Sequence, residues 1–221
     1  MKRTILSLGF LLSILIVSAQ IKPYQTTGLG MNFSYALLDD TDDGTVTPRF
    51  APLYNMSNYY HFDFAKSFGM FAGFTVGNVG FIVDWKDSLQ TTKKFRTYNF
   101  GVPIGFKLGQ MDAKEPFYFF FGGALEIPFH FKEKTFYDGK KDHKIKEWAS
   151  DRVNILQPSL FVGITFPNRN SVKISYYPMD FLNTSYTENV NGVQTRPYSN
   201  ILHSNIIMIT YGAGLTNIKK K

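Results

Sequence analysis

Apolar residues alternate with polar or small ones along much of the chain. The clearest stretch is residues 98–108, where Tyr, Phe, Val, Ile, Phe and Leu take the even positions and Asn, Gly, Pro, Gly and Lys the odd ones. A period of two places each set on its own side of a β-strand. The pattern therefore predicts an all-β protein.

Eight segments carry this alternation. We predict strands over residues 29–37, 59–65, 70–85, 98–108, 117–131, 154–166, 172–177 and 206–215. In residues 117–131 the odd positions, from Phe117 to Phe131, form an apolar face, and Glu126 and His130 lie on the other face. Residues 70–85 have apolar residues and glycines on both faces, so the pattern leaves the outward face of that strand open.

The less apolar face indicates which side meets water. It holds mainly Gly, Asn, Ser, Ala and Thr, whereas the outside of a soluble barrel should carry long polar side chains. Small, weakly polar residues suit the inside of a narrow barrel, and continuous aliphatic and aromatic residues suit lipid. We expect lipid contact for Phe100, Ile104, Phe121, Ile127, Leu160 and Tyr211, and a lumen position for Asn99, Lys107, Glu126 and Ser175.

The connections between the strands alternate in length. Long ones follow the odd-numbered strands, at residues 39–56, 86–94, 132–151 and 183–200, and short ones follow the even-numbered strands, at 66–69, 109–115 and 167–171. Outer-membrane barrels have long loops outside the cell and short turns in the periplasm. We therefore expect an eight-stranded antiparallel up-and-down transmembrane β-barrel in a bacterial outer membrane, with both termini in the periplasm.

The first twenty residues have the pattern of an export signal. Lys2 and Arg3 precede an apolar centre at residues 5–17, and Val17-Ser18-Ala19 offers small residues for cleavage. The segment is short for a membrane-spanning helix, although an uncleaved anchor is an alternative. We predict a signal peptide at residues 1–19 and one barrel domain at 20–221. Loss of the two basic residues would lower the formal charge from +7 to +5.

The composition narrows the possible chemistry. The chain has 22 Phe and 13 Tyr, which favour strands and membrane interfaces, and no Cys, which excludes disulfides and thiolate metal sites. The charge is scattered, and the mixed run at residues 132–152 is interpreted as a solvated loop. Because no basic stripe is interleaved with aromatic residues, we expect no nucleic-acid partner.

A few titratable residues could carry chemistry. His61 and Asp63 are two apart on one predicted strand, which is the start of a general-base arrangement, but no nucleophile can be placed beside them. We expect a hydrogen-bonded pair in the lumen. The adjacent His203 and Ser204 point to opposite faces of a strand, so we expect no working pair there.

Charged lumen residues are expected to pair with one another. Glu126 and His130 are four apart on the presumed lumen face, with Lys107, Lys132 and Lys173 nearby in the pattern. Buried charges require partners, so the favoured interpretation is a charge-paired interior, with ligand binding or proton chemistry as alternatives. None of the four His lies at metal-ligand spacing. We predict no catalytic residues, no metal and no cofactor, and the binding residues stay undefined.

Four segments carry a resemblance to a known family. They are the export site ending at Gln20 and residues 102–109, 119–134 and 176–183. On these, the chain resembles the small outer-membrane β-barrel proteins of the Bacteroidetes, described as PorT-like or OmpX/OmpA-like barrels. The resemblance implies a location and a fold rather than an activity. The chain departs from such barrels by running past Leu215 into a lysine tail, where they commonly end on an aromatic residue.

The leading functional hypothesis is a structural barrel, or one that interacts through its loops. The expected partners are outer-membrane lipid and lipopolysaccharide, and other envelope proteins through the extracellular loops. One alternative is an enzyme that modifies outer-membrane lipid, which needs a nucleophile near a His. Another is a soluble periplasmic ligand-binding barrel, whose apolar face would point inward. A general diffusion pore is disfavoured because such channels need more than eight strands.

Overall fold

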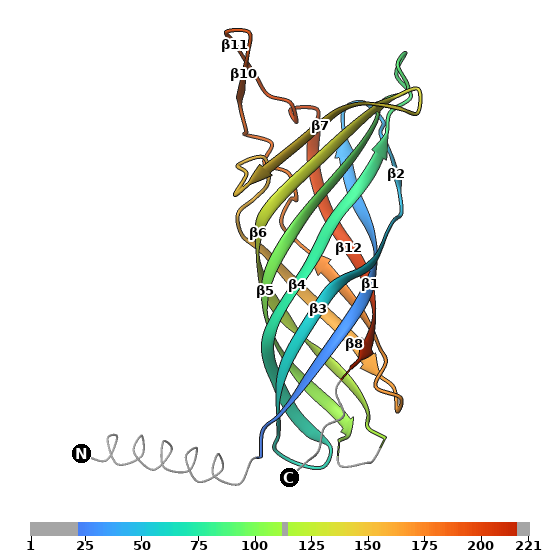
Figure 1. Cartoon of the computed structure of the whole chain (residues 1–221), viewed down its shortest axis with the longest axis vertical. Helices are drawn as coiled ribbons and strands as arrows, with labels where there is room; N and C mark the ends of the chain where they lie inside the picture. Colours follow the sequence, from blue (N-terminus) through green and yellow to red (C-terminus); the bar gives the residue numbers. More distant parts are fainter. Residues whose placement is uncertain (1–21, 112–114, 216–221) are drawn as a thin grey trace, which may run out of the picture.

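A computed structural model of the chain describes residues 22–111 and 115–215, which form a tall barrel of strands (Figure 1). The predicted signal peptide, residues 1–19, and the final lysines lie outside the described residues. Among the residues described, no helix has both the length and the apolar character needed to cross a membrane.

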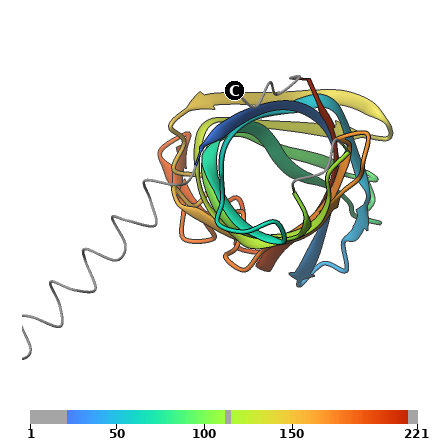
Figure 2. The same cartoon turned by 90° about the horizontal axis from the view of Figure 1, so that it is seen from below.

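Eight strands form a closed antiparallel ring, which confirms the predicted fold class (Figure 2). Each ring strand pairs with the next one along the chain. The last strand pairs with the first, from Gly28 opposite Gly214 to Asp40 opposite Ile201, and this pairing closes the ring. In ring order they are β1 (Tyr24–Asp40), β3 (Arg49–Asp63), β4 (Phe68–Asp84), β5 (Thr92–Gln110), β6 (Phe117–Tyr137), β8 (Gln157–Thr165), β9 (Ser171–Tyr177) and β12 (Ile201–Gly214).

The remaining strands lie at one end of the ring, here called the loop end (Figure 1). They are β2 (Thr45–Thr47) beside β4, β7 (Lys140–Trp148) beside β6, and the separate hairpin of β10 (Glu188–Val190) and β11 (Val193–Thr195). At the opposite end, the turn end, the strands are joined by residues 64–67, 111–116 and 166–170. The predicted alternation of long and short connections is confirmed.

Two predicted loops are largely strand. β3 begins at Arg49 rather than at residue 59, and β6 continues to Tyr137 before β7 folds back along it. Asp138 and Gly139 form the two-residue turn between them, with φ values of 46° and 72°. A primed turn needs positive φ at both positions, and Asp-Gly supplies it. Residues 39–56 look like a loop because the segment is polar, and residues 132–151 because it is rich in charges, but a strand that extends beyond the apolar wall can carry both kinds of residue.

The facing predicted for six apolar and four lumen positions is confirmed. Ile104 is 52% exposed on the outside, whereas Asn99 and Lys107 are 1% and 0% exposed on the inside. In β4, whose facing the sequence left open, Phe74 and Val76 are exposed on the outside, and the odd-numbered positions line the inside.

A β-bulge at Phe129 reverses the alternation of β6. Tyr98 pairs with His130 but Asn99 pairs with Pro128, so Phe129 has no opposite residue. Beyond it, Phe131 is fully buried, where the sequence placed it outside. His130 turns outward and contacts the exposed Trp148, where the sequence placed it in the lumen. One extra residue in a strand moves every later side chain to the other face.

The interior has three layers. The loop-end half is filled by a hydrophobic plug to which the loops contribute Val153, Phe181, Leu182 and Tyr198. Below it lies a polar layer in which Asn32 accepts hydrogen bonds from Asn55 at 3.3 Å and Thr210 at 3.0 Å. The turn-end half holds an aromatic cluster around Phe71, Phe120 and Phe161.

Candidate functional site

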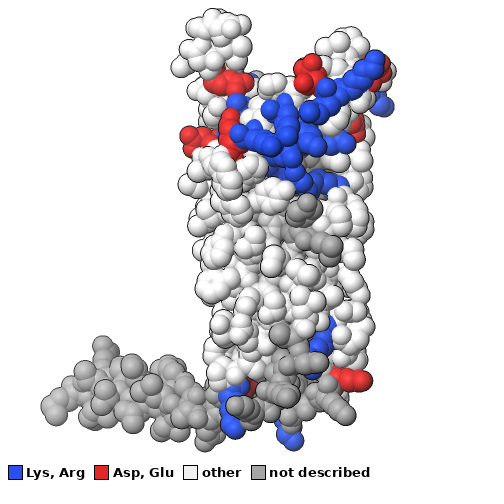
Figure 3. All heavy atoms as spheres, viewed as in Figure 1, with Lys and Arg blue, Asp and Glu red and all other residues white. Residues whose placement is uncertain are grey.

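Six cations form two rows across the outer faces of β5, β6 and β7. The strand register joins Lys94, Lys134 and Lys144 in one row and Arg96, Lys132 and Lys146 in the other. We call these six residues the basic face. Lys and Arg gather near the loop end of the wall, above a stretch that shows no charged side chain in the same view (Figure 3).

The basic face concentrates positive charge without neutralising it. Among the described residues, none of the six cations takes part in a salt bridge. Lys94 and Arg96 instead lie over aromatic rings, 4.8 Å from the centroid of Phe136 and 5.0 Å from that of Tyr98. A hydrogen bond with Lys146, followed by burial and by neighbouring positive charges, lowers the pKa of Lys144 from 10.5 to about 8. Like charges directly opposite each other in a sheet are destabilising.

Two glutamates of β6 and β7 point the other way. Glu133 is buried and accepts a hydrogen bond from the Tyr198 hydroxyl at 2.7 Å. Glu147 accepts one from Nε of Arg152 at 3.1 Å. Where β6 and β7 pair, the period of two thus places four lysines outside and two glutamates inside, in a run that the sequence suggested was a mixed, solvated loop. That interpretation of the run is corrected.

An aromatic row lies directly below the basic face, on the side toward the turn end. The register joins Tyr98, His130 and Trp148 across the same three strands. Trp148 is 74% exposed and stacks on Phe129 with ring centroids 6.0 Å apart. Below this row the outer wall continues with Phe100, which is also exposed. Aromatic girdles of this kind mark the edges of the apolar band of membrane barrels.

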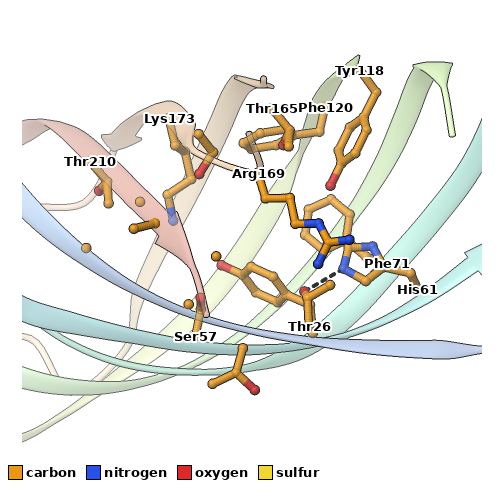
Figure 4. Close-up of a pocket in the computed structure, with 18 of the residues that line it drawn as sticks. Thr26, Ser57, His61, Phe71, Tyr118, Phe120, Thr165, Arg169, Lys173 and Thr210 are labelled. Carbon is orange, nitrogen blue, oxygen red and sulfur yellow. Dashed lines mark hydrogen bonds between the residues drawn. The ribbon is translucent and has the colours of Figure 1, made fainter. Parts of the chain in front are cut away.

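A cavity of about 510 Å³ occupies the turn-end half of the lumen (Figure 4). Aromatic rings including Tyr118, Phe71 and Phe161 line part of it, and small residues of β1 and β12 line another part. In Figure 4, Arg169 extends from the β8–β9 turn toward His61. This cavity is the place where the described lumen could admit a small molecule.

His61 and Asp63 are both in the lumen, as predicted, but they do not form the predicted pair. His61 Nε2 lies 2.8 Å from the Thr26 hydroxyl oxygen, and Asp63 accepts a hydrogen bond from Lys107 at 2.5 Å. Within the described residues, His61 Nδ1 has no hydrogen-bond partner. The imidazole therefore meets a hydroxyl but lacks a carboxylate to orient it, as a Ser-His-Asp type of arrangement requires.

The other lumen predictions have mixed outcomes. Lys107 is charge-paired as expected, but Glu126 is held by neutral donors, Tyr177 at 2.7 Å and Asn99 at 3.0 Å. The predicted association of Glu126 with His130 is wrong because the bulge separates their faces. Lys132 is likewise on the outside, and Lys173 lies over the Phe161 ring. His203 is exposed and Ser204 is buried, so they do point apart.

Sequence reasoning missed the basic face. Its signal is three cation pairs at a spacing of two: Lys94 with Arg96, Lys132 with Lys134, and Lys144 with Lys146. Their common level on adjacent strands depends on the bulge and on β7, which the sequence analysis did not predict. In the described part of the chain, no three or more His, Asp or Glu residues come together so that they could hold a metal ion.

No known family model matches the chain, and no curated protein matches it. Solved structures do. One is Ail, the attachment invasion locus protein of Yersinia pestis, solved in complex with the heparin analogue sucrose octasulfate. Its sequence is 13% identical to this one, the match covers 88% of this chain and 99% of that chain, and the TM-score is 0.35. Another is Neisserial surface protein A, with 10% identity, coverage of 87% and 97%, and a TM-score of 0.42. These matches assign no family, and the eight-stranded ring is established by its own strand pairing.

Proposed function

We propose that this chain is a bacterial outer-membrane protein whose loop end faces outside the cell and whose termini lie in the periplasm. The support is the wall itself, with exposed apolar residues such as Ile104 and Leu160 outside and polar ones such as Asn99 and Ser175 inside. The short turns lie at the end where the described chain begins and ends. Membership among the PorT-like or OmpX/OmpA-like barrels of the Bacteroidetes is part of this proposal and rests on the sequence resemblance.

Within the membrane, the barrel acts through its outer surface, as a structural or interaction protein. The observation that carries this is the plug. Phe81, Phe95 and Phe131 are 0% exposed, and Phe181 is 2% exposed, inside the loop-end half of the barrel. Close-packed rings there oppose a water-filled passage. The partners we propose are outer-membrane lipid and lipopolysaccharide at the wall and other envelope proteins at the loops.

Single cysteines test the location and the orientation, since the chain has no native Cys. Asn191→Cys places a thiol at the tip of the β10–β11 hairpin, and Ser67→Cys places one at the turn end. In intact cells, a membrane-impermeant maleimide should label the first variant, and should label the second only after lysis. The opposite order would reverse the orientation. Recovery of both variants in the soluble fraction would refute the membrane location.

A lipid-modifying enzyme is the second candidate, because the Thr26 hydroxyl lies 2.8 Å from His61 Nε2 beside the cavity. A hydroxyl next to an imidazole is the minimum for nucleophilic catalysis. This candidate requires that Thr26→Val and His61→Gln each abolish a change in lipid composition that the wild type produces, with the barrel still folded. A soluble periplasmic ligand-binding barrel would need its apolar face to point inward, but the apolar face of this wall points outward.

A further inference from the structure

We infer that the basic face binds the phosphate groups of a phosphorylated glycolipid that resides in the surrounding membrane leaflet. The lipid's acyl chains would lie along the aromatic row and the apolar wall below it. This inference rests on the proposed membrane location and names the partner of one patch of the outer surface.

The charge arrangement suits phosphate. Adjacent strands are about 4.8 Å apart, and residues two apart on a strand are separated by about 6.8 Å. Each row of three cations therefore spans roughly 10 Å, and a phosphate seated between the rows could contact cations from two or three strands. Lysine ammonium groups donate in several directions to phosphate oxygens, and the Arg96 guanidinium adds a planar fork. A ligand rich in negative charge would relieve the repulsion between Lys144 and Lys146.

The direction of the face favours a lipid over a soluble polyanion. The six cations project sideways from the wall, on the same side as the residues that we expect to meet lipid, rather than upward from the loops. Down β5, the outward positions run from Lys94 and Arg96 to Tyr98 and then Phe100. A ligand that contacts all of these outward positions needs an anionic head group above an apolar body, which is the chemistry of a membrane lipid.

Two features that a regular eight-stranded ring does not have produce the basic face. The Phe129 bulge brings Lys132 and Lys134 to the outside, and β7 adds a third strand that closes no part of the ring. Without β7 the rows would hold four cations instead of six. Bulges often re-aim side chains at functional positions.

Trp148 provides the test, because it is exposed beside the place where the acyl chains would lie. The full mature protein is reconstituted in zwitterionic bilayers that contain a small fraction of bisphosphorylated lipid A with brominated acyl chains. A matched sample holds the same fraction of brominated zwitterionic lipid. Bromine quenches nearby tryptophan, and Trp148→Phe supplies the background from Trp85. We expect stronger quenching by the phosphorylated lipid.

Charge-matched variants assign the effect to the basic face. Lys134→Gln/Lys144→Gln/Lys146→Gln should lose the excess quenching, with a loss of binding on the order of 100-fold if each cation contributes about fivefold. Lys66→Gln/Lys86→Gln/Arg196→Gln removes three exposed cations elsewhere and should retain it.

Each remaining outcome decides the question. Equal quenching by both lipids in wild type would overturn the inference. Cation-dependent binding of heparin in neutral detergent, without lipid enrichment in bilayers, would make the occupant a soluble polyanion and would also overturn it. If no brominated lipid quenches Trp148 at all, the proposed membrane location fails as well.

Discussion

At the scale of single residues, a charged side chain that is buried inside the barrel needs a partner. Lys107 is fully buried, and its ammonium group contacts Asp63 at 2.5 Å and the Tyr24 hydroxyl at 3.0 Å. It also lies 5.3 Å from the centroid of the Tyr118 ring. A buried ammonium group is tolerated only when it is paired and hydrogen-bonded. Asp63 is therefore committed to Lys107, which leaves His61 without a carboxylate.

Removal of that carboxylate should be costly. Asp63→Asn leaves Lys107 with a buried charge and should lower the free energy of unfolding by about 3–5 kcal/mol. The double variant Asp63→Asn/Lys107→Met should recover much of the loss, and Asp151→Asn, at an exposed acid, should change little. Urea unfolding in detergent measures all three. Equal stability of Asp63→Asn and the wild type would show that the pair is not needed.

The outward apolar positions lead to a second residue-scale prediction. Ile104 is 52% exposed in the middle of the outer wall, so Ile104→Arg would place a charge in the lipid hydrocarbon. The expected cost is about 2–4 kcal/mol near the bilayer midplane. Lys94→Arg, on the same face of β5 but above the aromatic row, is the control and should be neutral. Reversible folding into bilayers measures both, and a neutral Ile104→Arg would contradict a lipid-facing wall.

At the scale of elements, the sequence predicted the eight ring strands but placed their ends poorly. The Asp138-Gly139 turn and the Asn191-Gly192 turn of the β10–β11 hairpin are strong hairpin signals that the sequence does contain. The bulge at Phe129 is different. Apolar side chains at Phe129 and Phe131 suit both a lipid-facing wall and a hydrophobic plug, so alternation alone could not reveal where β6 changes face. Lys132 was placed near the lumen residues for the same reason.

Deletion of Phe129 tests the role of the bulge. Without Phe129, Pro128 still lies opposite Asn99 and His130 opposite Tyr98, so β6 pairs with β5 in continuous register and the later side chains keep their faces. We expect a loss of about 0.5–1.5 kcal/mol in unfolding free energy, because the stack of Phe129 on Trp148 is removed. Phe129→Ala loses the same stack but keeps the extra residue, so its stability should be similar. Urea unfolding measures both, and a deletion much less stable than Phe129→Ala would show that the bulge itself is needed.

The three-strand basic face should also respond to pH. The pKa of Lys144 is lowered to about 8, so its side chain is charged below that pH and loses its charge as the pH rises through it. Lys94 and Lys134 share its row, and Lys132, Lys141 and Lys146 lie nearby. Lipid enrichment at Trp148 should therefore fall roughly fivefold between pH 7 and 9.5, the loss of one cation. A bound phosphate would move the midpoint upward.

Lys144→Gln is the control for this pH dependence. It removes the titrating group, so its weaker enrichment should stay flat between pH 7 and 9.5. A wild type that is equally flat, or a variant that still falls with pH, would assign the titration to another group.

At the scale of the whole molecule, the loops divide into a part that holds the fold and a part that projects from it. From sequence, residues 183–200 were interpreted as one surface loop. The structure shows that this region contributes Tyr198 to the plug, while Phe181 and Leu182 enter just before it. Arg152 connects the two parts, because it donates hydrogen bonds to Glu147 and Glu188. No sequence pattern distinguishes an apolar loop residue that folds inward from one that stays at the surface.

The last prediction separates these two parts. Replacing residues 189–194 with a short Gly-Ser link removes the projecting hairpin but keeps Glu188, Tyr198 and the plug. The barrel should remain folded and heat-modifiable on a gel, with its unfolding free energy nearly unchanged. Phe181→Ala leaves the hairpin in place but opens a cavity among buried rings, where it contacts Phe81 at a centroid distance of 5.6 Å. Its expected cost is about 3–5 kcal/mol. If the trimmed variant instead unfolds as readily as Phe181→Ala, the hairpin is part of the fold. If it stays stable and loses the phenotype of the intact protein, the projecting loops are the surface through which the barrel acts.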